Sequence, residues 1–413
     1  MRARKVPVTT ATNSRSRPLG PDDLAIVLTG GGARAAYQVG FLRWIARHLP
    51  DTHFPIVTGV SAGAINAAYL AAHRGRQMEA VDRLCRLWRD LTVDRVFRTD
   101  SPSLARQVAR WGFRLLSGGA ALAPEVRGLV DTSPLRETLK DVFEARDSRI
   151  AGIAENVESG RLWALALVTS HYGNGQSVVW TEGRDLGRWE RPGRHSRNAS
   201  LTIDHVLASS ALPLFFPAVR LEDGWHGDGG IRLTAPFSPV LHLGANRVLA
   251  VSTRQAGAGA PGKTTTLAGD RRYPPPLQIS GQLLDAIFLD DLDRDAMELA
   301  RVNRLLRGLP PEKRHGLRPV DLLVVRPSED LGRLAGEYEP RLPRAFRYLV
   351  RGLGSREVDS PDLLSLLTFE PAYLRRLMEL GEADADLHAE RIRELLGSGS
   401  QPAATGAPVA LAG

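Results

Sequence analysis

The sequence IVTGVSAGAINAA, at residues 56–68, is the starting point for interpreting this chain. Its β-branched beginning is typical of a strand, which we expect to end at Thr58, and the alanine-rich row from Ala62 is typical of a helix. Ser61 stands between the two, flanked by Gly59 and Gly63. A serine on a sharp turn between strand and helix has a strained backbone, which only small neighbours leave room for. The pattern therefore predicts a nucleophile elbow, with Ser61 at the helix N-terminus.

A glycine-rich loop precedes this elbow. The apolar run from Leu24 to Thr29, typical of a buried parallel strand, leads into GGGAR at residues 30–34. Two interpretations are open, a dinucleotide fingerprint and an oxyanion loop. The fingerprint needs glycine where Ala35 stands and an acidic residue after the next strand, which leads instead to Ser61. The order of the segments favours an oxyanion loop, whose backbone N–H groups approach a developing negative charge.

Composition narrows the class of protein less than the motifs do. The chain has 413 residues and a net charge of +8, and nearly all of its 54 basic residues are arginines. Arginine suits phosphate groups, but this excess is compatible with nucleic acid, an anionic membrane or a solvated surface. We expect no nucleic-acid partner, because no aromatic and basic interleaving or zinc-ligand spacing accompanies the charge. The single cysteine, Cys85, excludes an intrachain disulfide, favours a reducing compartment and lies on the apolar face of a predicted helix.

No stretch reaches the roughly 18 apolar residues that span a bilayer. Residues 1–21 are basic and lack an apolar core, so we expect a disordered tail rather than a secretory signal. Residues 103–116 predict an amphipathic helix in which Arg106, Arg110 and Arg114 form one stripe. Such a helix fits an anionic membrane surface or a lid, and an ordinary surface helix is the alternative. We expect a cytoplasmic protein with peripheral membrane contact through this helix.

Two further segments stand out downstream. ASSALPLFFP, at residues 208–217, follows a predicted short helix that Thr202 or Asp204 would cap and Pro213 would end. Asp228 lies among glycines, with Gly229 and Gly230 directly after it. Glycines let the backbone fold tightly and bring the carboxylate close to another loop, although alone this sequence is an ordinary turn.

The remaining pattern alternates strands and helices. We expect strands at 162–168, 177–181, 247–253 and 320–325. We expect helices near 78–91 and 283–306, a helix that starts at Ser133, and a mostly helical segment at 341–396. The predicted organisation is a basic tail at 1–22, a catalytic domain at 23–330 with its motif core at 24–245, a helical C-terminal extension at 331–396 and a second disordered tail at 397–413.

The order of these motifs resembles the patatin-like phospholipases, which are serine lipid acyl hydrolases. The matching parts are the loop GGGAR at 30–34, the elbow GVSAG at 59–63, the segment ASSALPLFFP at 208–217 and DGG at 228–230. The resemblance implies an α/β fold of three layers, α/β/α, with a mostly parallel central sheet. Ala35 departs from the family pattern, which has glycine after the loop arginine.

The resemblance also implies the site. Ser61 would be the nucleophile and Asp228 the general base, with an oxyanion hole at Gly30, Gly31, Gly32 and Arg34 and motif support from Gly59, Gly63, Gly229 and Gly230. The substrate would be a phospholipid or another acyl-ester lipid, with no cofactor and no metal. A triad using His226 or His242 as proton relay stays open, and so does a catalytically silent patatin fold that binds lipid or regulates.

Overall fold

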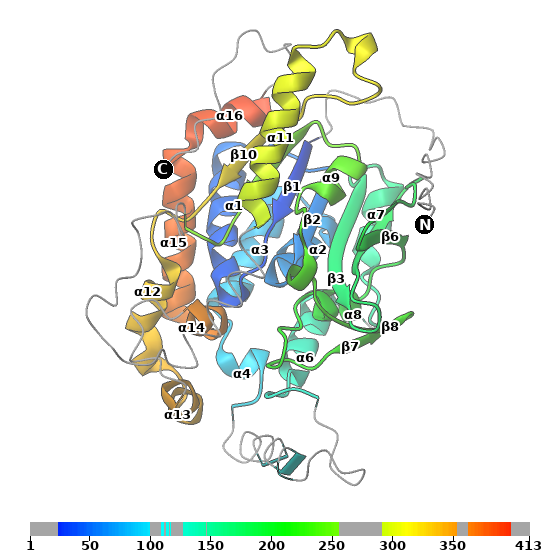
Figure 1. The fold of residues 1–413 in the computed structure, drawn as a ribbon. Helices are drawn as coiled ribbons and strands as arrows, with labels where there is room; N and C mark the ends of the chain where they lie inside the picture. The colour runs from blue at the N-terminus through cyan, green and yellow to red at the C-terminus, as the bar shows by residue number, and fades with distance from the viewer. Residues whose placement is uncertain are drawn as a thin grey trace, which may run out of the picture.

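A sheet of ten strands crosses the molecule, in the order β10-β9-β1-β2-β3-β4-β6-β5, with β8 joined to β3 and β7 to β8 (Figure 1). The computed structural model describes residues 24–99, 109–110, 113–114, 116, 127–145, 147–255, 291–352 and 362–397. The strands are β1 (Leu24–Leu28), β2 (Ile56–Val60), β3 (Ala164–His171), β4 (Ser177–Gly183), β5 (Glu190–Arg191), β6 (Arg194–Asn198), β7 (Val219–Leu221), β8 (Gly224–Asp228), β9 (Arg247–Val251) and β10 (Asp321–Val325). From β10 to β3 all pairs are parallel, which makes the sheet mostly parallel, as expected.

Helices flank both faces of this sheet. They are α1 (Ala36–His48), α2 (Ala62–Ala72), α3 (Gln77–Arg89), α4 (Val93–Val96), α6 (Ser133–Val142), α7 (Ala151–Glu158), α8 (Ile203–Ser209), α9 (Ser238–His242), α11 (Asp291–Arg307), α12 (Leu331–Tyr338), α13 (Arg344–Gly352), α14 (Asp362–Leu367), α15 (Pro371–Leu387) and α16 (Ala389–Gly397). Short 3-10 turns include η1 (Gly32–Ala35) and η2 (Gly229–Arg232). This architecture confirms the predicted three-layer α/β/α fold with C-terminal helices.

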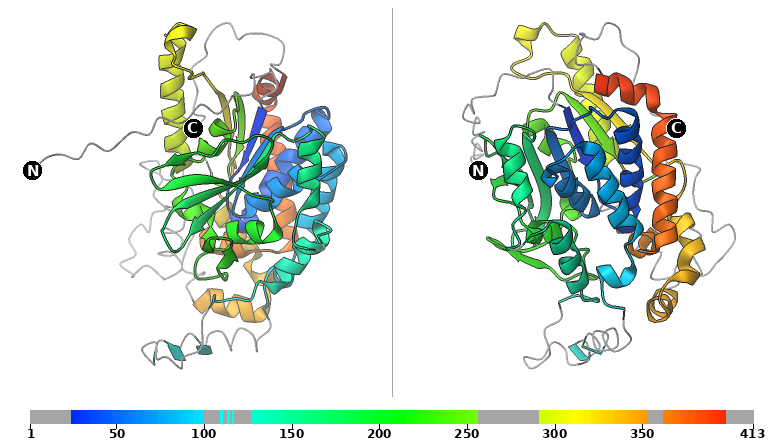
Figure 2. Two further views of the ribbon diagram at one scale, coloured as in Figure 1. Left: turned by 90° about the vertical axis from the view of Figure 1, so that its right-hand side faces the viewer. Right: turned by 180° about the vertical axis from the view of Figure 1, so that it is seen from behind.

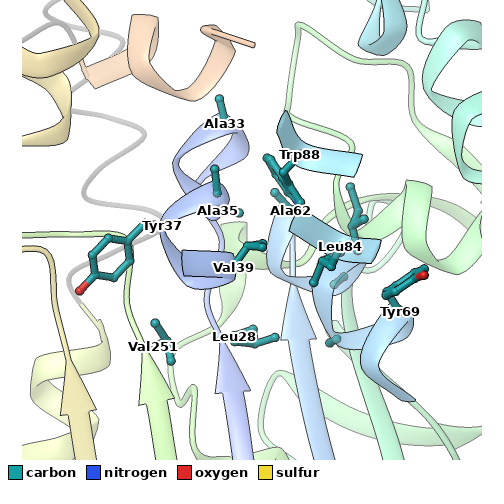
Figure 3. Packing of buried hydrophobic residues seen from close by; sticks show 14 of the residues in the cluster. Leu28, Ala33, Ala35, Tyr37, Val39, Ala62, Tyr69, Leu84, Trp88 and Val251 are labelled. Atoms are coloured by element: carbon teal, nitrogen blue, oxygen red, sulfur yellow. The ribbon is translucent and has the colours of Figure 1, made fainter. Parts of the chain in front are cut away.

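The two core layers follow from the alternation of side chains along the strands. In β1, Ile26 and Leu28 point into the larger core, which they share with α1, α2, α3 and α15. Ala25 and Val27 point to the other face and pack with residues of α9 and α11. Figure 2 shows the helical layers on either side of the sheet, and Figure 3 shows the tight packing above the ends of the central strands. Because β1 is buried on both faces, its sequence is continuously apolar rather than alternating.

Most of the predicted elements are confirmed to within a few residues. β2 runs two residues past the expected end at Thr58, and α2 begins at Ala62 as expected. Cys85 is buried in α3, where it packs in the core. The amphipathic helix at 103–116 lies mostly outside the described residues, as do residues 283–290 and the tails at 1–22 and 398–413. Among the described helices, none combines the length and the apolar character needed to cross a membrane.

The C-terminal helices pack directly against the first part of the chain. Helix α15 lies along α1, and α14 lies against η1. The approach is close because two glycines face the partner backbone: a Cβ on Gly40 would lie 1.8 Å from the carbonyl oxygen of Met378, and one on Gly381 would lie 2.0 Å from that of Tyr37. This interface carries α14 to the glycine loop, and so to the edge of the candidate site.

Candidate active site

Ser61 occupies the turn between β2 and α2, as the sequence predicts. Its backbone has φ 55° and ψ −134°, a conformation that side-chain-bearing residues rarely adopt and that surrounding structure must hold in place. The flanking glycines are required by contact: a Cβ on Gly59 would lie 2.6 Å from the Cβ of Ala67, and one on Gly63 would lie 2.3 Å from the carbonyl oxygen of Leu28. The elbow therefore fits only with glycine at both positions.

Asp228 ends strand β8 and is completely buried. Its Oδ1 accepts a hydrogen bond from the backbone N–H of Gly230, with N and O 2.9 Å apart. Its Oδ2 is buried and has no hydrogen-bond partner of good geometry among the described residues. Burial raises the pKa of this carboxyl to about 7, although the Ser61 hydroxyl and the Gly230 N–H both act to lower it. The carboxyl therefore titrates near neutral pH, where a general base is most effective.

Strand β3 brings Ser61 and Asp228 together. Pairing of β2 with β3 stops where Val60 faces Val168, and the antiparallel pairing of β8 begins at the next residue, where Asp228 faces Thr169. Strand β4 covers the other edge of β3, so β2 and β8 meet end to end on one edge. Ser61 and Asp228 thus lie beside neighbouring residues of β3. Gly229 allows the close approach, because a Cβ there would lie 2.1 Å from the carbonyl oxygen of Val168.

The glycine loop closes over Ser61. A Cβ on Gly30 would lie 2.9 Å from the Cβ of Ser61, which shows how near the loop comes. Gly31 and Gly32 have φ of 152° and 53°, in the region that favours glycine, and η1 starts at Gly32. Ala35 is helical with φ −65°, so the departure from the family pattern needs no unusual backbone. Gly30 therefore lies beside Ser61, and Gly31 and Gly32 line the same pocket as Ser61.

Sequence reasoning missed the residues that hold this loop. The Thr253 hydroxyl, after β9, donates to the carbonyl oxygen of Gly30. The Gln38 amide donates to the carbonyl oxygen of Thr29 at 2.8 Å, and Asn66 donates to the Gln38 side chain at 3.0 Å. Trp88 in turn donates to Asn66 at 2.8 Å. A signal was present, since Gln38 and Asn66 are polar residues in otherwise apolar helix stretches, and buried polar groups need partners.

Arg34 lies in η1 and is buried, with its guanidinium directed to the C-terminal helices. Its Nη2 lies 2.5 Å from Oδ1 of Asp362, and its Nε donates to the Ser365 hydroxyl at 2.5 Å. This ion pair ties the glycine loop to α14. The Arg34 side chain therefore contacts the C-terminal helices, and its predicted part in an oxyanion hole stays a prediction.

An apolar pocket opens beside Ser61. Its walls come from η1, α2, α3, α4, α6, the segment after α8, and α14 with the turn after it; the lining includes Ile65, Trp88, Leu91, Leu135, Leu212, Phe216, Leu366 and Phe369. Gly31, Gly32, Ser61 and Ser210 add polar groups to this lining. A long apolar chain attached to a carbonyl fits this distribution of groups.

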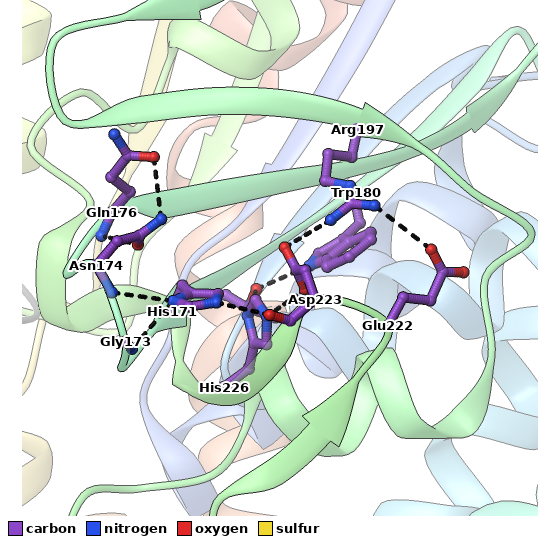
Figure 4. A network of polar contacts seen from close by, with 10 residues as sticks. His171, Gly173, Asn174, Gln176, Trp180, Arg197, Glu222, Asp223 and His226 are labelled. Atoms are coloured by element: carbon purple, nitrogen blue, oxygen red, sulfur yellow. Dashed lines mark hydrogen bonds and ion pairs between the residues drawn. The ribbon is translucent and has the colours of Figure 1, made fainter.

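The one cluster of three potential metal ligands in the described part of the chain is His171, Asp223 and His226 (Figure 4). Its atoms are already engaged. Nε2 of His226 lies 2.8 Å from Oδ1 of Asp223, and its Nδ1 lies 2.9 Å from the Thr169 hydroxyl. Nδ1 of His171 accepts two backbone N–H groups, and its Nε2 lies 3.1 Å from the carbonyl oxygen of Asp223. The network is complete without an ion and braces the strand that carries Asp228.

The two histidines considered as relays have other contacts. Both nitrogens of His226 serve the network just described, and His242 stacks on Trp189 with ring centroids 4.2 Å apart. Within the described residues, no hydrogen bond joins either histidine to Ser61 or Asp228. Burial lowers the pKa of both, to about 4 for His242.

At one end of the mostly parallel sheet lie a strained serine, a buried carboxyl and a glycine loop. This arrangement, on an α/β/α fold, is the one expected of a serine hydrolase. The family model for patatin-like phospholipases matches residues 26–241, and the chain belongs to that family. The resemblance seen in the sequence is thereby confirmed, and membership supports lipid hydrolysis in general. No curated protein sequence matches this chain.

Several solved structures align with this chain at low identity. Human GIVD cytosolic phospholipase A2 aligns with a TM-score of 0.47 and 13% identity, over 93% of this chain and 61% of that one. Its complex with methyl gamma-linolenyl fluorophosphonate aligns with a TM-score of 0.43 and 15% identity, over 93% and 60%. VipD from Legionella pneumophila aligns with a TM-score of 0.30 and 12% identity, over 84% and 67%. This chain spans about three fifths of the length of the human protein.

Proposed function

We propose that this protein is a lipid acyl hydrolase that cleaves carboxylic esters through an acyl-enzyme on Ser61, with Asp228 as general base. The observation that carries the proposal is the meeting of β2 and β8 on one edge of β3, which puts a hydroxyl beside a buried carboxyl whose pKa is about 7. An acyl chain would lie in the apolar pocket, with its carbonyl next to Ser61. Phospholipids are the substrates that the family name suggests.

The reaction would run in two halves. Oγ of Ser61 attacks the ester carbonyl carbon while its proton passes to the Asp228 carboxylate. The backbone N–H groups of Gly31 and Gly32 stabilise the oxyanion. The C–O bond to the alcohol then breaks, and the alcohol leaves with the proton from Asp228. Water attacks the acyl-enzyme, gives its proton to Asp228, and the fatty acid departs as Oγ of Ser61 recovers that proton.

The test is release of free fatty acid from phospholipid vesicles and of nitrophenol from a short-chain nitrophenyl ester. We expect Ser61→Ala and Asp228→Asn to lose at least about 10³-fold in kcat on both substrates, as removal of a nucleophile or its base usually costs. The matched control is Ser196→Ala, at a buried serine on β6 whose hydroxyl accepts the backbone N–H of Trp189 at 2.9 Å. Vesicle binding without ester cleavage by the wild type would favour the catalytically silent lipid-binding protein instead.

We propose in addition that the basic stripe of residues 103–116 brings the enzyme to anionic membranes from the cytoplasmic side. Its three arginines repeat every fourth residue, and the phosphates of an anionic lipid surface attract such a stripe. Arg106, Arg110 and Arg114 changed together to glutamate should weaken sedimentation with phosphatidylserine vesicles and leave cleavage of a short soluble ester unchanged. Undiminished vesicle association of that variant would refute the contact.

A further inference from the structure

Two neighbouring buried serines, Ser209 at the end of α8 and Ser210 directly after it, have different partners. The Ser210 hydroxyl donates back to the last turn of α8, where the carbonyl oxygens of Val206 and Leu207 lie 2.9 and 3.3 Å away. The Ser209 hydroxyl leaves the helix. It donates to the carbonyl oxygen of Val168 at 2.6 Å and accepts the backbone N–H of Ser61 at 3.1 Å. Ser209 has no exposed surface, so water does not compete for these bonds.

Ser209 occupies the junction where β2 stops and β8 begins along β3. Val168 is the last residue of β3 that faces β2, and the next residue faces Asp228. The N–H of Ser61 needs an acceptor from outside, because Ser61 is the N-cap of α2 and an N-cap N–H has no partner within its helix. The Ser209 hydroxyl uses its single proton to donate to the carbonyl oxygen of Val168. A lone pair of its oxygen is therefore left to accept the backbone N–H of Ser61.

The same segment holds the other half of the site. The backbone N–H of Asp228 donates to the carbonyl oxygen of Ala211 at 3.1 Å. Ser209 and Ala211 are two residues apart, so one short stretch of chain binds the backbone amides of both proposed catalytic residues. The strained φ of Ser61 needs such an external restraint to persist.

We propose that Ser209 is a positioning residue for the Ser61 nucleophile: its hydroxyl fixes the backbone of Ser61, and with the carbonyl of Ala211 it sets the separation between Ser61 and Asp228. This inference rests on the proposed acyl hydrolase function. It assigns a task to the segment ASSALP, which the sequence marks but does not explain.

The test compares wild type, Ser209→Ala, Ser209→Cys and the control Ser196→Ala. We expect Ser209→Ala to lower kcat on a short nitrophenyl ester about 10- to 100-fold, the loss that a misplaced reacting group causes, with KM unchanged. Ser209→Cys keeps a weak acceptor of similar size and should restore part of that loss. Ser196→Ala removes an equivalent hydroxyl acceptor far from β2 and should retain wild-type kcat. If Ser209 were merely structural, Ser209→Ala and Ser196→Ala would have the same kcat.

Deuterium exchange provides a second measurement that does not depend on activity. Removal of the acceptor should speed exchange in the peptide that contains residues 58–64 in Ser209→Ala and leave it unchanged in Ser196→Ala. Wild-type kcat in folded Ser209→Ala, or unchanged exchange at 58–64, would overturn the proposal. If Ser209→Ala does not fold, Ser209→Cys decides by the same two measurements. An inactive wild type would refute the hydrolase function, and the exchange result would still show whether Ser209 restrains Ser61.

Discussion

The region around Ser61 and the C-terminal helices meet at one pocket, and they contribute to it in opposite ways. The region around Ser61 and Asp228 holds a strained backbone and a fully buried carboxyl, and both features cost stability. Helices α14 and α15 contain regular backbone, close helix packing and the ion pair to Arg34. The proposed catalytic residues thus lie in a strained, buried region, and the helices that support this region carry none of the sequence motifs.

We expect the C-terminal helices to be needed for activity as well as for stability. Leu366, Leu367 and Phe369 line the pocket, and a Cβ on Gly32 would lie 2.2 Å from the carbonyl oxygen of Leu366. The boundary expected near residue 331 therefore separates segments of sequence that share one site in space. Four changes test how far the two parts depend on each other.

The largest effect is expected from the ion pair between them. Arg34→Met removes the guanidinium that contacts Asp362 and Ser365, and it should lower the free energy of unfolding by about 3 to 5 kcal/mol, as loss of one partner of a buried pair does. Esterase kcat should fall as well, because the glycine loop loses its anchor. Urea unfolding and ester kinetics measure the two effects.

A control lies on the same interface. Arg47 pairs with Glu382 at 2.6 Å, but its side chain is 56% exposed, so Arg47→Met should cost at most about 1 kcal/mol and leave kcat unchanged. Equal losses in the two variants would contradict the special position of Arg34.

The second prediction concerns how much burial of the Asp228 carboxyl lowers the free energy of unfolding. Because its pKa rises from 3.8 to about 7 on folding, the folded state holds the proton more tightly, and its contribution to stability is lost as pH increases through about 7. Relative to Asp228→Asn, which does not titrate, wild type should lose about 2 to 3 kcal/mol of unfolding free energy between pH 5 and pH 8. Thermal and urea unfolding at both pH values provide the measurement.

The same carboxyl predicts the activity profile. A base must be deprotonated, so kcat/KM should decrease below about pH 7 with a slope of one proton. A kcat/KM that stays constant from pH 8 down to pH 5 would rule out Asp228 as the base with this pKa.

The region around Ser61 could be predicted from the sequence better than the role of the C-terminal helices, for a physical reason. A nucleophile elbow constrains the chain locally, so glycines at fixed distances from Ser61 make it recognisable. The buried strands can also be recognised from the local sequence, since β1 is apolar throughout. Family resemblance then supplied Asp228, whose surroundings alone read as an ordinary turn.

Support from distant residues leaves no such local signature. Thr253 is 223 residues from Gly30, and Asp362 is 328 residues from Arg34, so only the folded chain shows that they touch. The hydrogen bond between Ser209 and the backbone N–H of Ser61 is hidden from the sequence in the same way. Ser209 and Ser210 are the same residue type, and only their hydrogen-bond partners in the folded chain distinguish them. The roles of the C-terminal helices could not be predicted because packing against α1 uses ordinary apolar residues and glycines.

The third effect probes the helix interface by volume. Gly381→Ala in α15 places a Cβ only 2.0 Å from the carbonyl oxygen of Tyr37, closer than two such atoms can pack. The substitution should destabilise the protein by about 1 to 3 kcal/mol. Gly336→Ala in α12 is the matched control, since a Cβ there meets no atom within 4 Å beyond its chain neighbours and its own helix backbone, and it should stabilise by up to about 1 kcal/mol. Denaturant unfolding should show a single transition in both variants. A separate early transition in Gly381→Ala would instead show that the C-terminal helices fold independently of the site.

The smallest effect concerns selectivity rather than stability. Leu366→Trp enlarges a side chain on the pocket wall supplied by α14, and it should lower kcat/KM for a long-chain ester about 10-fold relative to a short-chain ester, because a few methylene-sized contacts are worth that much discrimination. Leu387→Trp, at a leucine of α15 that is 76% exposed, should leave the ratio unchanged. A ratio equally unaffected in Leu366→Trp would mean that the acyl chain does not contact α14. The C-terminal helices would then support the site only through Arg34 and the close packing against α1.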